Sequence, residues 1–393
     1  MSTLKVNTIT TRTGDTVTVA SGKTLQTDTI KDNSNNTLIS SDGTNIALGA
    51  NVAPGRSPSF RNIIINGDMS IAQRGTSATG ITGTGYNTVD RFKHIISGLG
   101  TWTASQSTEV PTGQGFANSF KMDCTTADAS PASGDYNILS QIVEGANIQY
   151  LKKGTSSAES LTLSFWVKSN KTGTYICEIF DGNNTRQISK SYTINSADTW
   201  EKKTITFSGD TSGAIGTGAS AFLQFNWWLA VGSDRSSGTL NTSWNSTTNA
   251  NRVVGQVNLA DAVNNQFYIT GVQLEAGTQA SPFEFLPYDV NLERCQRYYQ
   301  TIRGMVGYAA GTTVFQTSIQ FPKVMRAAPS VSLSGVLRIT DGASNFTQSS
   351  ISITQQQSLD DRWFGLFGNF TGLTQFRPGS KSQDDLFQLS AEL

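Results

Sequence analysis

The stretch "AFLQFNWWLAVG", residues 221–232, contains two adjacent tryptophans that a β-strand would point in opposite directions. Successive side chains of a strand alternate between its two faces. Trp227 then joins Leu, Phe and Val on an apolar face, while Trp228 lies with Gln224 and Asn226 on a polar one. An aromatic ring can cover the C–H face of a sugar while neighbouring amides bind its hydroxyl groups. Trp228, Gln224 and Asn226 are therefore candidate ligand-binding residues.

The stretch "LTLSFWVKS", residues 161–169, repeats this pattern. Alternation places Ser164, Trp166 and Lys168 on a polar face, opposite Leu, Phe and Val. We expect these three residues to contribute to the same sugar-binding surface. The alternative is that a loop or a neighbouring chain covers the polar face and that both tryptophans are core residues. Trp200 is expected to be structural, and Trp244 lies in a Ser/Thr/Asn-rich loop that could form a contact surface.

Catalytic patterns are weak in this sequence. His94 is the single histidine, it lies in a predicted strand, and no G-x-S-x-G motif supplies a nucleophile. Glycoside cleavage requires only two carboxylates, and Glu178, Glu275 and Glu284 are on or near predicted strands. Such carboxylates more often belong to solvated faces or sheet pairs. We therefore expect a non-enzymatic protein.

Metal-binding patterns are also weak. Cys124, Cys177 and Cys295 lie far apart without the paired spacing of a zinc site or a disulfide framework. Cys124 and Cys177 fall in apolar alternation and are expected to be buried thiols. The sequence "DGNN", residues 181–184, fits a hairpin turn better than a calcium loop. We predict no metal and no cofactor.

The composition is polar but weakly charged. The chain of 393 residues has 29 Lys plus Arg and 29 Asp plus Glu, and charged residues make up 15% of it. A nucleic-acid-binding protein would carry a basic stripe, and none is visible. No apolar run is long enough to insert into a membrane, and "MSTLKVNTIT" lacks the apolar core of a signal peptide. We expect synthesis and folding in a cytoplasm.

The first fifty residues contain a repeat with an offset of 21 residues. It aligns Leu4 with Leu25 and Ile9 with Ile30, and a third copy begins at Ile46. Each copy has too few apolar residues to bury a face alone, so neighbouring chains must supply the rest. Residues 1–50 are predicted to form an oligomerising β-shaft, although a disordered polar tail is the alternative. The Pro/Gly/Ser-rich residues 51–60 are predicted to form a linker.

The rest of the chain is predicted to be all-β. Many short alternating segments with turns between them indicate a β-sandwich. They are residues 61–75, 90–96, 118–124, 136–145, 159–169, 173–182, 200–209, 221–232 and 266–277. One short helix is expected at residues 289–300, with Leu292, Cys295 and Tyr299 on one face. It joins residues 61–288 to a small C-terminal β-domain at 289–393, with strands expected at 312–321, 330–339, 349–355, 361–370 and 385–393.

Several motifs together resemble a module of bacteriophage tail fibres. They are "NIIINGDMSIAQRG" with "VDRF", "LTLSFWVKSNKTGTY", "VQLEAGTQASPFEFLPYDVNLERCQRYYQ" and, for a following C-terminal domain, "FPKVMRAAPSVSLS". The resemblance covers residues 61–393 in pieces. It implies a jelly-roll sandwich similar to carbohydrate-binding modules, carried on a homotrimeric fibre of the virion.

Three functions are compatible with this resemblance. The first is host adsorption by a receptor-binding tail fibre, with the N-terminus attached to other tail or baseplate proteins and the β-domains recognising a host cell-surface glycan. The second is a decoration or connector protein that binds other virion proteins. The third, less favoured, is a polysaccharide depolymerase.

Overall fold

The computed structural model describes residues 29–31, 37–41, 46–48, 60–218, 220, 222–303, 306–334, 337–340, 344–348, 363–370, 372–373, 375, 377–381 and 386–393. The chain divides into two compact units, Met1–Pro58 and Ser59–Leu393. Nearly all of the regular structure is antiparallel sheet, so the all-β prediction is confirmed. No helix in the described part of the chain combines the length and apolar character that a membrane crossing requires.

In the first unit, three short strands form an antiparallel sheet. They are β1 (Thr29–Lys31), β2 (Thr37–Ser41) and β3 (Ile46–Leu48). The second sequence repeat supplies β1 and β2, where Ile30 pairs with Ile39. The side chains of this pair are 39% and 37% exposed. The first repeat, residues 4–22, lies outside the described residues.

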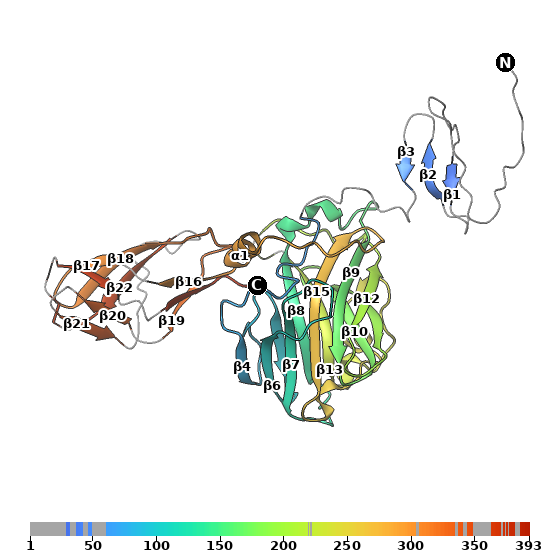
Figure 1. The fold of residues 1–393 in the computed structure, drawn as a ribbon, viewed down its shortest axis with the longest axis horizontal. Coiled ribbons are helices and arrows are strands. Elements are labelled where there is room, and N and C mark those ends of the chain that lie inside the picture. The colour runs from blue at the N-terminus through green and yellow to red at the C-terminus, as the bar shows by residue number, and fades with distance from the viewer. Residues whose placement is uncertain are drawn as a thin grey trace, which may run out of the picture. The chain divides into compact units, whose positions relative to one another are not determined.

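The second unit contains two six-stranded sheets packed face to face (Figure 1). Their strands are β4 (Ser77–Ile81), β5 (Lys93–Ser97), β6 (Thr101–Ser107), β7 (Ser119–Thr126), β8 (Tyr136–Glu144), β9 (Leu161–Ser169), β10 (Gly173–Asp181), β11 (Arg186–Ile194), β12 (Glu201–Phe207), β13 (Phe222–Val231), β14 (Asn245–Ser246) and β15 (Gln266–Ala276). One sheet has the order β14-β11-β10-β13-β8-β5 and the other has the order β12-β9-β15-β7-β6-β4. Five short 3-10 helices lie in the described connections: η1 (Gly145–Asn147), η2 (Gln149–Leu151), η3 (Ser233–Arg235), η4 (Asn249–Asn251) and η5 (Leu259–Asp261).

The core of this sandwich is made by one alternating face of each sheet. Trp227 of β13 and Phe165 of β9 are both completely buried and meet edge to face, with ring centroids 6.1 Å apart. Cys124 and Cys177 lie in the same core, as predicted. Because these strands bury every second residue inward, their other side chains project from the two outer faces of the sandwich.

The strand expected at residues 61–75 is wrong, because this segment is irregular and the first strand of the second unit, among the described residues, begins at Ser77. Three consecutive isoleucines are buried here, so the segment has no solvent face and cannot alternate. Two backbone hydrogen bonds join the segment to β15, from Ile63 N to Leu274 O (2.9 Å) and from Val272 N to Gly67 O (2.8 Å). The side chain of Asn62 adds two more, donating to Val272 O (3.0 Å) and accepting from Leu274 N (3.1 Å). Asn66 has φ 60°, which a regular strand does not allow.

The helix α1 (Tyr288–Gln296) is present but shorter than the expected residues 289–300. Tyr299 begins strand β16 (Tyr299–Arg303) and is not on the helix. Cys295 packs with Ile65 and Ile71 of the irregular segment. The helix is therefore anchored on the sandwich as well as connecting it to the following strands.

The C-terminal strands form a three-stranded sheet, β16-β24-β19, and a six-stranded sheet, β21-β20-β23-β17-β18-β22. They are β17 (Val306–Ala309), β18 (Val314–Gln320), β19 (Ser330–Ser334), β20 (Leu337–Thr340), β21 (Asn345–Gln348), β22 (Trp363–Asn369), β23 (Pro378–Lys381) and β24 (Leu386–Ser390). One apolar cluster joins the two sheets through Ile302, Phe315 and Phe387. The chain end returns to the sandwich, where Glu392 pairs with Arg91. The strand expected at 349–355 lies outside the described residues, and a domain boundary at 288/289 stays a prediction.

Candidate functional site

Trp228 does not form an exposed surface. It lies on the outer side of β13, as alternation predicts, but its side chain is 0% exposed. Its ring packs with Ile138, Ile176 and Val253, and Val253 comes from the connection between β13 and β15. The indole N–H donates to Glu178 Oε2 at 3.1 Å. The prediction that this ring is open to a ligand is wrong, because the connection after β13 folds over it.

The polar neighbours of Trp228 belong to the same buried network. Asn226 is 2% exposed and donates to Glu178 Oε2 at 2.9 Å, and Gln224 donates to Asn226 Oδ1 at 2.9 Å. Arg252 binds both carboxylate oxygens of Glu178, at 2.7 and 2.9 Å. This network fixes the covering segment to the sheet, so Asn226 is not available to a ligand. Gln224 is partly exposed at its edge.

Trp166 and Trp228 point to opposite sides of the molecule. Trp166 belongs to the sheet of β9, whereas Trp228 belongs to the sheet of β13. Their sequence neighbours Phe165 and Trp227 meet in the core between the two sheets. One binding surface containing both tryptophans is therefore excluded by the fold.

Trp166 is partly exposed on the outer side of β9. It pairs in register with Lys202 of β12 on one side and Thr270 of β15 on the other. Ser164, two residues earlier, is only 3% exposed, so its predicted contact with a ligand is wrong. The chain after β15 covers that part of the sheet, where Glu284 N donates to the side chain of Gln273, the register partner of Ser164.

Beside Trp166, aromatic and basic side chains form a line across neighbouring strands. Lys168 Nζ lies 4.7 Å from the ring centroid of Tyr268 and 6.0 Å from that of Trp200. Lys121 Nζ lies 5.6 Å from the Tyr268 ring on its other side. Trp200 and Tyr268 meet edge to face at 6.1 Å. We call Trp166 together with these four residues the β9 face.

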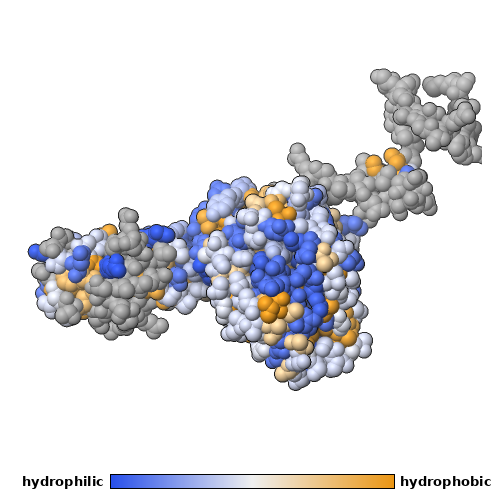
Figure 2. Space-filling view, turned by 60° about the horizontal axis from the view of Figure 1, so that its bottom comes forward, coloured by the Kyte–Doolittle hydropathy of each residue, from blue (hydrophilic) through white to orange (hydrophobic). Residues whose placement is uncertain are grey.

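Each of the two lysines of the β9 face forms an ion pair with a nearby carboxylate. Lys168 Nζ is 2.9 Å from Glu109 Oε1, which also accepts from the Trp200 indole N–H at 3.3 Å. This hydrogen bond from Lys168 lowers the pKa of Glu109. Lys121 pairs with Asp123 at 3.1 Å. The result is a polar surface with flat rings and little net charge, and the surface in Figure 2 is likewise mainly hydrophilic, with only small hydrophobic patches on the sandwich.

The sequence pattern predicted Trp166 and Lys168 of this face and missed the other three residues, Lys121, Trp200 and Tyr268. Trp200 was expected to be only structural, yet it is partly exposed beside Lys168. Tyr268 could have been found by alternation, since Phe267 and Ile269 face the core and Tyr268 must then face outward. The Tyr268 hydroxyl donates to Gln266 at 2.8 Å, which fixes the ring, and Tyr268 is only 8% exposed between Lys168 and Lys121.

The three candidate carboxylates are engaged by the protein itself. Glu178 is bound as described above. Glu275 accepts from Ser281 N (2.8 Å) and Oγ (2.6 Å), and Glu284 accepts from Phe60 N (2.6 Å) and Asn62 N (2.9 Å). Glu178 and Glu275 lie in different sheets. None of the three is presented to solvent as an open acid or base.

His94 and Asp181 are both buried and contact other residues of the fold. His94 is 1% exposed, lies 5.3 Å from the Phe120 ring, and burial lowers its pKa from 6.5 to about 3. Asp181 accepts from Asn184 N at 3.0 Å and pairs with Lys153 at 2.5 Å, in the predicted hairpin between β10 and β11. The described residues contain no cluster of His, Cys, Asp and Glu that could hold a metal ion.

No family model and no curated protein matches this sequence. Solved structures that are similar to it include the enzymatically active domain of tailspike protein 4 of bacteriophage CBA120, at 14% identity and a TM-score of 0.30, over 58% of this chain and 22% of that chain. A CBM4 structure is similar at 11% identity and a TM-score of 0.28, over 54% and 97% of the two chains. A family 11 carbohydrate-binding module from Clostridium thermocellum, in complex with a β-1,3-1,4-mixed-linked tetrasaccharide, is similar at 10% identity and a TM-score of 0.26, over 52% and 98%.

Proposed function

We propose that this protein binds a glycan on the β9 face and performs no catalysis. The observation that carries this proposal is that Trp166 and Trp200 are partly exposed beside Lys168, whose ammonium group lies over the ring of the buried Tyr268. Aromatic rings offer apolar surface to the C–H groups of a sugar, and the surrounding charged and hydroxyl groups offer hydrogen bonds to its hydroxyls. Because the lysines are paired with Glu109 and Asp123, the face suits an uncharged stretch of polysaccharide.

We further propose that the protein is a homotrimeric bacteriophage tail fibre located on the virion. Residues 1–50 form the shaft and contact other tail or baseplate proteins, while the Ser59–Leu393 unit recognises a glycan on the host surface. The exposed pair Ile30 and Ile39 supports the shaft, since such a pair gains most from burial against other chains. Three weak sites on one fibre would bind a repetitive surface by avidity.

A connector protein that binds other virion proteins is the second candidate, because partly exposed aromatic rings among polar groups, as on the β9 face, are also suited to contact with another protein. A glycan array separates the two, since a connector retains no polysaccharide. The depolymerase alternative is less favoured, since Glu178, Glu275 and Glu284 are all held by neighbouring groups. An assay for reducing ends released from host polysaccharide tests it directly.

The proposal predicts that Trp166→Ala weakens binding to host surface polysaccharide by about 1–3 kcal/mol per site. This is the scale measured for nucleobases that stack on aromatic side chains. The ring is partly exposed, so the variant should still fold with nearly the same melting temperature. Binding is measured by adsorption of the purified protein to host cells and by glycan array.

Tyr308→Ala is the matched control, because Tyr308 is an aromatic residue that is 43% exposed on β17, outside the β9 face. It should bind like the wild-type protein. If Trp166→Ala and Trp200→Ala both adsorb as well as Tyr308→Ala, the β9 face is not the glycan site.

A further inference from the structure

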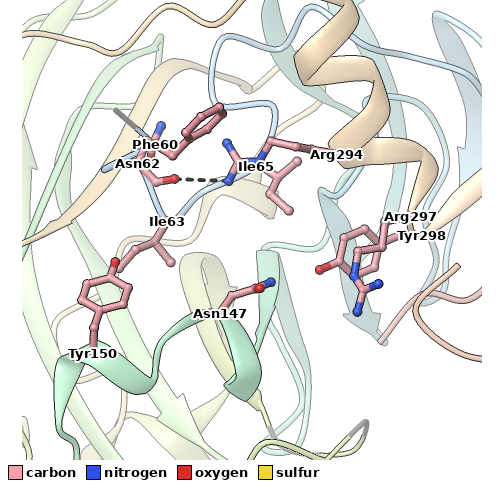
Figure 3. A pocket seen from close by; sticks show the side chains of 9 residues that line it. All are labelled: Phe60, Asn62, Ile63, Ile65, Asn147, Tyr150, Arg294, Arg297 and Tyr298. Carbon is pink, nitrogen blue, oxygen red and sulfur yellow. Dashed lines mark hydrogen bonds between the residues drawn. The ribbon is translucent and has the colours of Figure 1, made fainter. Parts of the chain in front are cut away.

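A pocket of about 290 Å³ lies where α1 meets η1, η2 and the start of the irregular segment (Figure 3). This volume is near the lower end of the range for small-molecule sites and suits one sugar ring. The pocket is separate from the β9 face and shares no residue with it. Its lining residues are Phe60, Asn62, Ile63, Ile65, Asn147, Tyr150, Arg294, Arg297 and Tyr298.

Arg294 brings to this pocket a positive charge that has no ion-pair partner among the described residues. Its side chain is partly buried on α1, and among the described residues its one hydrogen bond is a long one, from Nη2 to Asn62 O at 3.3 Å. Figure 3 shows this contact at the upper wall of the pocket. No carboxylate of the described residues lies within ion-pair distance of Arg294. Burial lowers the pKa of Arg294, and the charge of Glu284 acts in the opposite direction. Partly buried guanidinium groups are normally paired, so this one has unused donors.

The charged groups next to Arg294 form ion pairs or hydrogen bonds with other groups of the protein. Arg297 binds both oxygens of Glu144 at 2.9 Å, and the Tyr298 hydroxyl donates to the same carboxylate at 2.5 Å. Glu284 is held by two backbone N–H groups and lies 3.9 Å from Arg61. Among the lining residues that the structure describes, Arg294 is therefore the cation without an ion pair, and the neighbouring Arg297 is paired with Glu144.

The other lining groups suit a sugar ring. The side chains of Tyr150 and Phe60 are 50% and 60% exposed, large values for aromatic residues beside a pocket. Asn147 is also exposed, and its amide makes no hydrogen bond within the described residues. In Figure 3, Tyr150 and Asn147 lie along one side of the pocket and Arg294 lies across from them.

We propose that this pocket binds one acidic sugar residue, a hexuronate, through its carboxylate. The guanidinium of Arg294 forms charge-assisted hydrogen bonds with the carboxylate, for which its planar fork is well shaped. Tyr150 covers a C–H face of the ring, and Asn147 binds a hydroxyl group. This site is additional to the β9 face and gives the protein a preference for polysaccharides with acidic residues.

Titration of the full-length protein with glucuronate, glucose, acetate and inorganic phosphate tests the proposal. We expect saturable glucuronate binding with a dissociation constant of about 1 mM, and glucose binding at least about tenfold weaker. Arg294→Gln leaves a shorter, polar side chain without the charge, and it should weaken glucuronate binding about tenfold or more. Tyr150→Ala should weaken it several-fold while folding normally, because its side chain is half exposed.

Arg303→Gln is the matched control, since it removes the same charge from an exposed position at the end of β16. It should bind glucuronate like the wild-type protein, as should Trp166→Ala, because the β9 face is a different site. The proposal is overturned if glucuronate does not saturate, if glucose binds equally well, or if Arg294→Gln and Tyr150→Ala both bind normally. Phosphate or acetate binding as tightly as glucuronate would also overturn it, because the site would then recognise a simple anion.

Discussion

Trp227 and Trp228 are adjacent, point in opposite directions, and are both completely buried. Trp227 is buried between the sheets, whereas Trp228 is buried by the segment that carries Arg252 and Val253. The ring of Trp228 also donates one of the hydrogen bonds that satisfy Glu178. Its role is therefore to hold this covering segment on the sheet.

We predict that Trp228→Ala lowers the free energy of unfolding by about 3–5 kcal/mol, as expected for loss of a buried ring. Trp228→Phe keeps much of the apolar area but removes the N–H donor to Glu178, so it should cost about 1–3 kcal/mol. Chemical unfolding measures both variants, with Trp166→Ala as the partly exposed comparison. Equal stabilities of Trp228→Ala and the wild-type protein would contradict the burial of this ring.

His94 makes the folded protein sensitive to mild acid. Burial lowers its pKa from 6.5 to about 3, so the folded state holds it neutral while the unfolded chain takes up a proton below pH 6.5. The free energy of unfolding therefore falls as the pH decreases below 6.5, by about 1.4 kcal/mol per pH unit. This loss continues until the pH reaches the pKa of the folded state.

The prediction is that His94→Gln abolishes this dependence. Between about pH 7 and about pH 5, the wild-type protein should lose about 2 kcal/mol more stability than the variant. Asp90 has the opposite effect, since burial raises its pKa to about 6, but it is present in both proteins and cancels in the comparison. Urea unfolding at the two pH values measures the difference. Parallel losses in the two proteins would show that His94 does not titrate in this way.

At the scale of elements, the irregular segment before β4 packs directly on β15. A Cβ atom at Gly67 would lie 2.0 Å from the backbone oxygen of Val272, and this strand cannot move away. Gly67→Ala should therefore destabilise the protein by about 1–3 kcal/mol, as overpacking does. Gly83→Ala is the control, because a Cβ there meets nothing within 4 Å. Equal melting temperatures of the two variants would contradict this packing.

Alternation within a strand was predictable from the sequence, and the covering of a strand was not. The sides on which Trp166, Trp227 and Trp228 lie follow from local backbone geometry, which a single strand already determines. Whether an outer face stays open depends on contacts with segments that are distant in sequence. Val253 covers Trp228, and the Glu284 backbone covers the neighbourhood of Ser164, and neither contact leaves a periodic pattern.

The Arg294 pocket could not be predicted for the same reason. In the sequence, Arg294 is one of several polar residues between the apolar positions of the predicted helix, and nothing distinguishes it from them. Its significance arises because Tyr150, Asn147 and Phe60 come from distant parts of the chain and because no carboxylate among the described residues is placed to pair with it. The absence of a partner is a property of the folded arrangement and has no signature in the sequence.

At the scale of the whole molecule, the first unit has exposed apolar side chains that assembly of several chains would bury. The small sheet of the first unit leaves the paired side chains of Ile30 and Ile39 39% and 37% exposed. A sheet this small buries little apolar surface by itself, whereas closed symmetric packing of identical chains would bury this pair. The Ser59–Leu393 unit has its own apolar cores, so it does not need the small sheet of the first unit in order to fold.

We predict that the intact protein has a mass in solution of three chains of 42.2 kDa each. Ile39→Asp places a charge in the proposed contact and should release single chains, because an unpaired buried carboxylate is costly. Thr29→Asp adds the same charge one position from Ile30, on the other face of β1, and should remain a trimer. Light scattering with size-exclusion chromatography measures the mass, and thermal unfolding should show that the Ser59–Leu393 unit of Ile39→Asp remains folded. A monodisperse monomer or dimer of the wild-type protein at micromolar concentration would contradict trimeric assembly.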